Sequence, residues 1–210
     1  MTVHAQQLQA RVERAPIDRH AQAAGGMALL VLGAAFLTAT MLAASIAPAY
    51  DFHGGAISDL GVIDQTAMLF NGLLVAVGAL NIGAGYLLYR WHRRAWIFGV
   101  YLLAGLGAAG AGVLPLDTGA PHSLFALSGF VFFNIEALAT AAVLRGPMRL
   151  LSVVAGFIGL VYVVVMVIGD SGNPAIFGAI GHGGSERLIV YPAMLWTLTV
   201  GGYLLARSDR

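Results

Sequence analysis

Six long apolar stretches, separated by short polar segments, account for most of the chain. A helix that crosses the hydrocarbon core of a bilayer needs about 20 mainly apolar residues, and each stretch is close to this length. The pattern predicts an all-α membrane protein, a bundle of six transmembrane helices over residues 24–206, with an arm (residues 1–23) before it and a short tail (residues 207–210) after it. The expected spans are Ala24–Ala47, Ala67–Tyr89, Ala95–Leu116, Ser123–Leu144, Leu150–Gly169 and Leu188–Ala206.

The first apolar stretch has a competing interpretation as a cleaved secretory signal peptide. Ala44 and Ala47 resemble the small residues of a cleavage site. However, the stretch is longer than the apolar region of about 7–15 residues in such peptides, and the segment before it carries the acidic residues Glu13 and Asp18. We therefore favour an uncleaved membrane anchor.

Composition supports the membrane assignment and removes several classes of function. Hydrophobic residues make up 59% of the chain and charged residues 10%, against roughly 45–50% and about 25% in soluble domains. Cysteine is absent, which excludes disulfides, thiolate metal sites and cysteine nucleophiles. Nucleic-acid binding requires a basic stripe, and the chain has none. Membrane lipids are the expected partners, and a homo-oligomer is a further option.

The basic residues predict the orientation of the bundle in the membrane. All eleven are arginines, and ten of them fall on one side of a six-span topology. Positive residues are retained on the cytoplasmic side, so we expect a multi-pass protein of the cell membrane with both termini in the cytoplasm. The ten are Arg11, Arg14, Arg19, Arg90, Arg93, Arg94, Arg145, Arg149, Arg207 and Arg210.

Most acidic residues, and half of the histidines, fall at the opposite end. The acidic residues there are Asp51, Asp59, Asp64, Asp117, Asp170 and Glu186, and each of the three outer loops adds one histidine, namely His53, His122 and His182. Because short loops at one end of a small bundle lie close together, these side chains are candidates for a shared site. Three histidines and a carboxylate such as Asp59 suit zinc or another divalent metal, and an acid–base pair without metal is an equal option. The metal signal is weak because the histidines lack the i, i+4 spacing of specific motifs.

Structural roles compete with catalytic ones at several of these positions. Ser58 and Asp59 precede the second span, where their side chains would cap the helix. At the last span, Ser185 would be the cap, while Glu186 would complement the helix dipole and form a local ion pair with Arg187.

One acidic residue lies inside a span. Glu136 is about 20 Å below the outer end of the fourth helix, where an ionised carboxylate is costly. We therefore expect it to be protonated, hydrogen-bonded or in contact with a wet cavity, with Asn81 as its partner at similar depth. Functional and structural interpretations are balanced here. A proton- or ion-coupled transporter would use Glu136 and Asn81, with Asn71 further out.

The third span is nearly bare of side chains between Ala104 and Gly112, where it reads Ala-Gly-Leu-Gly-Ala-Ala-Gly-Ala-Gly. Small residues let membrane helices approach closely. The stretch therefore predicts tight packing of a central helix, or else a wall of a ligand cavity.

These observations favour an outward-facing pocket under the external loops that binds, and could process, a lipid or another apolar small molecule. A structural or assembly role in the membrane is a further alternative. Haem is not expected, because no two histidines lie on facing helices at matching depth. The expected polar rim consists of His53, Asp59, His122, His182 and Glu186, with Ser58, Asn71, Asp117 and Arg187 nearby.

Several short motifs resemble a known family. They are Ile57-Ser-Asp-Leu-Gly61, Phe70-Asn71, Leu114-Pro115, His122-Ser123, Glu186-Arg187 and Tyr191-Pro192. Between about Ala24 and Ala206 the chain resembles the six-span bacterial and archaeal membrane proteins catalogued as domain of unknown function 998. This resemblance implies the fold and a prokaryotic membrane, and the family carries no established activity.

A looser similarity points to membrane hydrolases of the alkaline ceramidase and progestin-receptor type, which bind zinc through His and Asp. It gives a metal-dependent hydrolase as an alternative function. The chain lacks the paired histidines on one helix and one of the seven spans of those enzymes.

Overall fold

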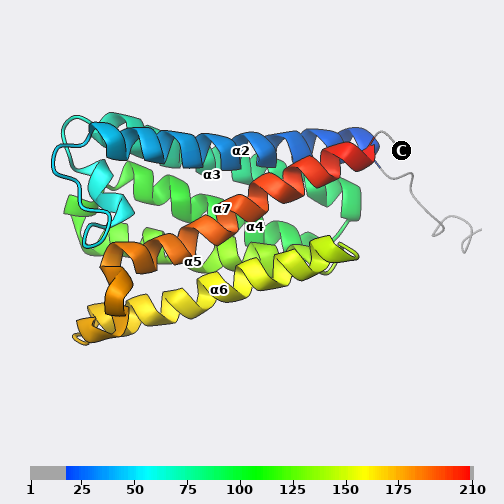
Figure 1. Cartoon of the computed structure of the whole chain (residues 1–210). Helices are drawn as coiled ribbons and strands as arrows, with labels where there is room; N and C mark the ends of the chain where they lie inside the picture. The colour runs from blue at the N-terminus through cyan, green and yellow to red at the C-terminus, as the bar shows by residue number, and fades with distance from the viewer. Residues whose placement is uncertain (1–17, 209–210) are drawn as a thin grey trace, which may run out of the picture.

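The computed structural model describes residues 18–208, and within this range the fold is all-α (Figure 1). The long helices are α2 (Arg19–Ile46), α3 (Ala67–His92), α4 (Ala95–Val113), α5 (Ala120–Thr140), α6 (Pro147–Asp170) and α7 (Gly181–Ser208). Three short 3-10 helices, η1 (Ile57–Gly61), η2 (Leu116–Thr118) and η3 (Pro174–Ile180), lie in the connections. Six helices of the described chain are long and apolar enough to cross a membrane, which confirms the all-α, six-helix prediction.

The six helices form a closed ring in which each packs against the next along the chain. The last helix, α7, closes the ring by packing along α2, and it also touches α5 and α6. It runs obliquely across the bundle, from beside α6 at one end to beside α2 at the other (Figure 1). This crossing brings α7 over the centre of the bundle, where it can contribute to a site shared with α3, α4 and α5.

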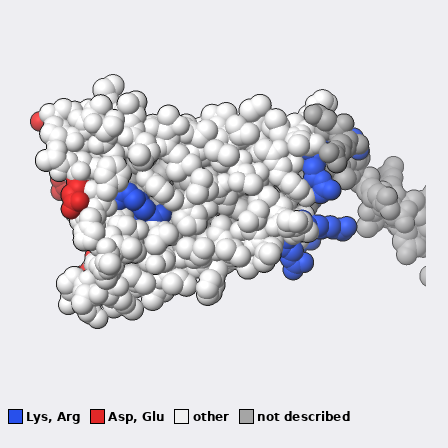
Figure 2. Space-filling model, viewed as in Figure 1, with Lys and Arg blue, Asp and Glu red and all other residues white. Residues whose placement is uncertain are grey.

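The two ends of the bundle differ in charge. We call one the Arg end; it holds the start of α2, the α3–α4 and α5–α6 turns and the end of α7. We call the other the acidic end; it holds η1, η2 and η3. Figure 2 shows basic groups gathered mainly at the first and acidic groups at the second. Arg11, Arg14, Arg210 and most of the N-terminal arm lie outside the described residues.

Local capping explains how the bundle begins and turns at the Arg end. The Asp18 side chain caps α2 by accepting a hydrogen bond from the Ala21 N–H at 2.9 Å, and it forms an ion pair with Arg90 at 2.7 Å. The Ala21 N–H, and then Arg90, hold the pKa of Asp18 below its usual range. Arg93 ends α3 in the left-handed conformation, with φ at 59°, which lets α4 start two residues later.

The Gly-rich part of α4 packs as closely as its sequence suggests. A Cβ atom at Gly105 would lie 2.6 Å from the Gly78 carbonyl oxygen of α3 and 2.6 Å from Cγ1 of Ile82, so the two helix backbones are in direct contact. Farther along, Gly107, Ala108 and Ala111 face a cavity. The stretch therefore combines close packing against α3 with a wall of this cavity, through different residues.

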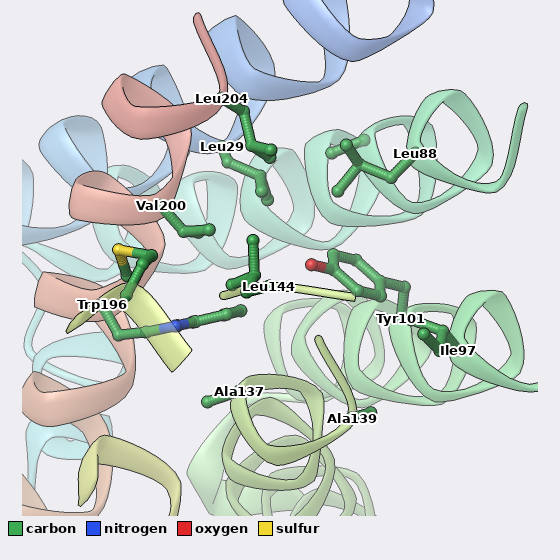
Figure 3. Packing of buried hydrophobic residues seen from close by; sticks show 12 residues of the cluster. Leu29, Leu88, Ile97, Tyr101, Ala137, Ala139, Leu144, Trp196, Val200 and Leu204 are labelled. Carbon is green, nitrogen blue, oxygen red and sulfur yellow. The ribbon is translucent and has the colours of Figure 1, made fainter. Parts of the chain in front are cut away.

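A large apolar cluster toward the Arg end holds the ring together (Figure 3). Its side chains come from several helices and include the indole of Trp196, whose Nε1 donates a hydrogen bond to Ser152 Oγ at 2.8 Å. The members labelled in Figure 3 are Leu29, Leu88, Ile97, Tyr101, Ala137, Ala139, Leu144, Trp196, Val200 and Leu204.

The start of the last helix differs from the prediction. α7 begins at Gly181, before the expected cap at Ser185 and the expected span from Leu188, so His182 is a helical residue and not a loop residue. Ser185 is not the cap, because its Oγ donates to the Gly181 carbonyl within the helix at 2.9 Å. The glycines that suggested a loop serve close approach instead, since a Cβ at Gly183 would clash with the Gly55 carbonyl oxygen of the α2–α3 connection.

Candidate functional site

A cavity of about 80 Å³ opens among the helices beneath η1. One buried water needs about 10–15 Å³ on a comparable measure, so the space exceeds that of a single water. From Glu186 to Met194 it follows α7 for about 12 Å, at 1.5 Å per residue. Its apolar lining consists of Phe36, Ile57, Phe70, Leu74, Val77, Gly107, Ala108, Ala111, Ala126, Gly129, Phe130, Phe133, Ile189, Val190, Ala193 and Met194, and its polar lining of Ser58, His122, Asn134 and Glu186.

Glu186 supplies the one acidic side chain of the cavity lining. It lies in the second turn of α7, is 3% exposed, and its Oε2 accepts a hydrogen bond from the Ile57 N–H at 2.6 Å. The expected ion pair with Arg187 is absent from the salt bridges of the described residues. Neighbouring helical residues point about 100° apart, and here Glu186 faces the cavity while Arg187 reaches the α2–α3 connection.

His122 enters the cavity from the first turn of α5. It is 4% exposed, and its Nδ1 lies 2.7 Å from the Leu114 carbonyl oxygen. A carbonyl oxygen only accepts hydrogen bonds, so Nδ1 carries a proton, and Nε2 is an acceptor whenever the ring is neutral. Asp117, which the sequence places near the polar rim, is exposed on η2. The Leu114 carbonyl is the partner of the ring because Leu114 ends α4 next to it.

The η1 turn covers the cavity and presents Ser58 to it. Asp59 Oδ2 accepts a hydrogen bond from the Ala56 N–H at 2.8 Å, so Asp59 caps η1. The sequence had suggested that it caps the second span, and this prediction is wrong. The span starts only at Ala67, too far along the chain for Asp59 to cap it. Asn71 Nδ2 donates to the Gly61 carbonyl at 2.8 Å and ties α3 to the end of η1.

Arg187 fastens the α2–α3 connection to α7. Its Nη1 donates to the carbonyl oxygens of Phe52 at 3.0 Å, Gly183 at 2.7 Å and Gly55 at 3.4 Å. Nη2 donates to the Tyr50 hydroxyl at 2.8 Å, and the guanidinium lies 4.8 Å from the centre of the Phe52 ring. Arg187 is therefore a clamp for the connection that carries η1.

Tyr50 extends this clamp toward η1. Its hydroxyl donates to the Ala56 carbonyl at 2.7 Å, directly before the turn. Burial raises the pKa of Tyr50, which favours the protonated hydroxyl that this hydrogen bond needs. The hydrogen bonds from Arg187 to Tyr50 and from Tyr50 to Ala56 thus fix the position of η1 over the cavity.

His53 and His182 lie outside the cavity lining. His53 is exposed, and its carbonyl accepts a hydrogen bond from the Gly183 N–H at 2.9 Å. The N–H of His53 donates to Asp51, which lowers the pKa of that carboxyl. His182 Nε2 lies 3.3 Å from Asp170 Oδ1, and its ring packs edge-on against Phe177.

The three histidines of the acidic end therefore have separate local partners. Residues 18–208 contain no group of three His, Asp or Glu side chains arranged to hold a metal ion. His122 and Glu186 line the cavity, as does Ser58, but the expected rim of three histidines does not form around it.

Glu136 and Asn81 form the predicted pair in the core. Glu136 Oε2 accepts a hydrogen bond from Asn81 Nδ2 at 2.8 Å, and the same amide donates to the Tyr101 carbonyl at 3.1 Å. Both side chains are fully buried, and neither is among the residues that line the cavity. The pair joins α3, α4 and α5 in the packed part of the bundle.

Asn134 is a cavity residue that was not among the candidates predicted from the sequence. Its Nδ2 donates to the carbonyl oxygens of Phe130 at 2.7 Å and Ile189 at 3.1 Å, which joins α5 to α7. An uncharged polar residue within an apolar span is a general sign of an interhelical hydrogen bond, and that sign was available in the sequence.

Comparison with known proteins identifies the family of the chain. The family model described as "Protein of unknown function (DUF998)" matches residues 23–203. The chain therefore belongs to this family. It matches no curated protein and no solved structure. Four of the motifs on which the family resemblance was based contribute residues to the cavity lining. They are the segment that forms η1, Phe70-Asn71, His122-Ser123 and Glu186-Arg187.

Proposed function

We propose that this DUF998 protein binds an apolar small molecule or a single-chain lipid in the cavity beneath η1. The observation that carries the proposal is the composition of the cavity lining, which is apolar except for a few buried polar groups. Ligand sites of this kind combine hydrophobic walls with a small number of fixed polar groups. Here Ser58, His122 and Glu186 would orient the ligand at the acidic end.

The hydrogen bonds around η1 support this role. Arg187 and Tyr50 hold η1 above the cavity through hydrogen bonds, so the polar groups are fixed in advance of binding. Preorganised groups bind with a lower entropic cost. Transport through Glu136 draws no support from this cavity, since that residue does not line it.

A cavity-filling substitution tests the proposal. Ala126 lines the cavity from α5, and we expect Ala126→Leu to reduce retention of single-chain amphiphiles by at least about tenfold, since added methylenes occupy the ligand space. The measurement is native mass spectrometry of the purified protein after incubation with 1-octanol and related octyl compounds.

The matched control is Ala79→Leu, the same change at an exposed position of α3. It is expected to retain the same amount of ligand as the unmodified protein. Equal retention by Ala126→Leu and Ala79→Leu would contradict a site in this cavity, and no retention by the unmodified protein would contradict binding itself.

We further propose that the acidic end faces outward and the Arg end faces the cytoplasm. The described arginines support this orientation, because all except Arg187 lie at the Arg end and positive residues are retained inside. Under this proposal the cavity is nearer the outer surface, and a ligand enters from that side or from the outer leaflet.

Cysteine labelling tests the orientation directly, because the chain has no cysteine of its own. Ala120→Cys lies at the acidic end and Ala142→Cys at the Arg end, and both positions are exposed. In intact cells, a membrane-impermeant maleimide should label Ala120→Cys and should label Ala142→Cys only after permeabilisation. The reverse pattern would invert the proposed topology.

A further inference from the structure

Glu186 and His122, at the acidic end of the cavity, both offer hydrogen-bond acceptors. Glu186 uses Oε2 for the Ile57 N–H, and no other hydrogen bond to its carboxyl group occurs within the described residues. His122 uses its Nδ1–H for the Leu114 carbonyl, which leaves Nε2 as the ring nitrogen available to a ligand. Two acceptors that line one cavity suit a ligand head that donates hydrogen bonds.

The charge of Glu186 further restricts which head groups the cavity can bind. Burying a carboxylate is unfavourable unless a cation or several donors compensate it, and Glu186 forms no salt bridge within the described chain. The nearest candidate in the sequence, Arg187, donates instead to carbonyl oxygens and to the Tyr50 hydroxyl. A cationic head in the cavity would supply the missing partner for Glu186.

We infer that the cavity binds an amphiphile with a primary ammonium head and a single apolar tail, with the head held by Glu186 and His122. An ammonium group is a compact cation with three donors, which is enough for both acceptors. The inference rests on the proposed function and specifies its ligand class.

The remainder of the cavity accounts for the tail. Below the polar groups, Val77 and Ala193 belong to an apolar wall that continues along α7 for about 12 Å. Such a wall suits a hydrocarbon chain. The other polar residue of the lining, Asn134, uses its amide N–H groups for the Phe130 and Ile189 carbonyls. An anionic head, such as a carboxylate or a phosphate, would lie beside Glu186 at the acidic end and would be repelled.

Three probes with the same tail and different heads test the inference. Binding of octylamine, 1-octanol and octanoate to the full chain in nanodiscs is measured by calorimetry, with empty nanodiscs as the blank. Octylamine is expected to bind at least about tenfold more tightly than octanoate. In Glu186→Gln, octylamine binding should weaken at least about tenfold, because the ammonium loses the carboxylate charge that pairs with it, while 1-octanol binding changes less than about threefold.

Two controls show whether the loss of octylamine affinity in Glu186→Gln comes from misfolding of the cavity or from the removal of any negative charge. Gln retains an acceptor for the Ile57 N–H, and unchanged 1-octanol binding shows that the cavity is intact. Asp117→Asn removes a charge from an exposed position at the same end, where solvent and salt screen it, and should change octylamine affinity less than about twofold.

The outcomes also distinguish this inference from the proposed function. Equal binding of all three probes, abolished by Ala126→Leu, would overturn the ammonium preference and leave the cavity as a binding site. An equal loss of octylamine affinity in Asp117→Asn and Glu186→Gln would overturn the role of Glu186. No binding of any probe would overturn both proposals.

Discussion

Replacing Arg187 with alanine is expected to lower the free energy of unfolding by about 3 kcal/mol, since hydrogen bonds to charged groups contribute about 1.5–3 kcal/mol each and do not add fully. The guanidinium binds three carbonyl oxygens and one hydroxyl at 2.7–3.4 Å. Its loss leaves these acceptors without their donor and frees the connection that carries η1. Thermal or denaturant unfolding of the purified protein in detergent measures the change.

Two further variants make this prediction specific. Arg187→Lys retains the charge but offers a single nitrogen in place of the planar fork, so it should recover only part of the lost stability. Arg207→Ala removes an exposed arginine at the Arg end and should change the unfolding free energy by less than about 0.5 kcal/mol. Similar losses in Arg187→Ala and Arg207→Ala would show that the clamp contributes nothing beyond charge.

Gly105→Ala is expected to destabilise the bundle by about 2–3 kcal/mol, within the range for overpacking. The added Cβ would lie 2.6 Å from the Gly78 carbonyl oxygen and 2.6 Å from Cγ1 of Ile82. The first of these contacts involves backbone, which cannot rotate away, so α3 and α4 must separate. The same unfolding measurement gives the magnitude.

Gly99→Ala is the matched control on the same helix. Nothing lies within 4 Å of a Cβ at that position, and alanine favours a helix over glycine by about 1 kcal/mol. This variant should be neutral or slightly stabilising. If Gly105→Ala were equally neutral, the contact between α3 and α4 would be looser than the structure indicates.

Arg187 and Gly105 support different parts of the cavity. Arg187 holds η1, which covers the cavity at the acidic end. Gly105 sets the spacing between α3 and α4, and the residues of α4 that follow it, Gly107 and Ala108, belong to the cavity wall. Loss of either support should therefore also weaken ligand retention. The cavity depends on packing over the whole helix rather than on its lining residues alone.

The sequence by itself determined the six spans, because each helix in a bilayer must satisfy its own backbone hydrogen bonds with a continuous apolar stretch. It also identified the pairing of Glu136 with Asn81, since a buried acid requires a polar partner at its own depth. The close packing of Gly105 followed from residue size alone. These features depend on distance along a helix, which the sequence specifies directly.

Only the tertiary structure decided which polar residues meet. The sequence grouped His53, His122 and His182 by their place in the loops, yet His122 pairs with the Leu114 carbonyl and His182 with the Asp170 carboxyl group. It also placed the start of α7 too late, after a cap at Ser185, because Gly181 and Gly183 serve close approach to the α2–α3 connection. Contacts between segments more than a hundred residues apart, such as Ile57 with Glu186, decide which polar residues lie together. The local pattern of residues does not predict such contacts.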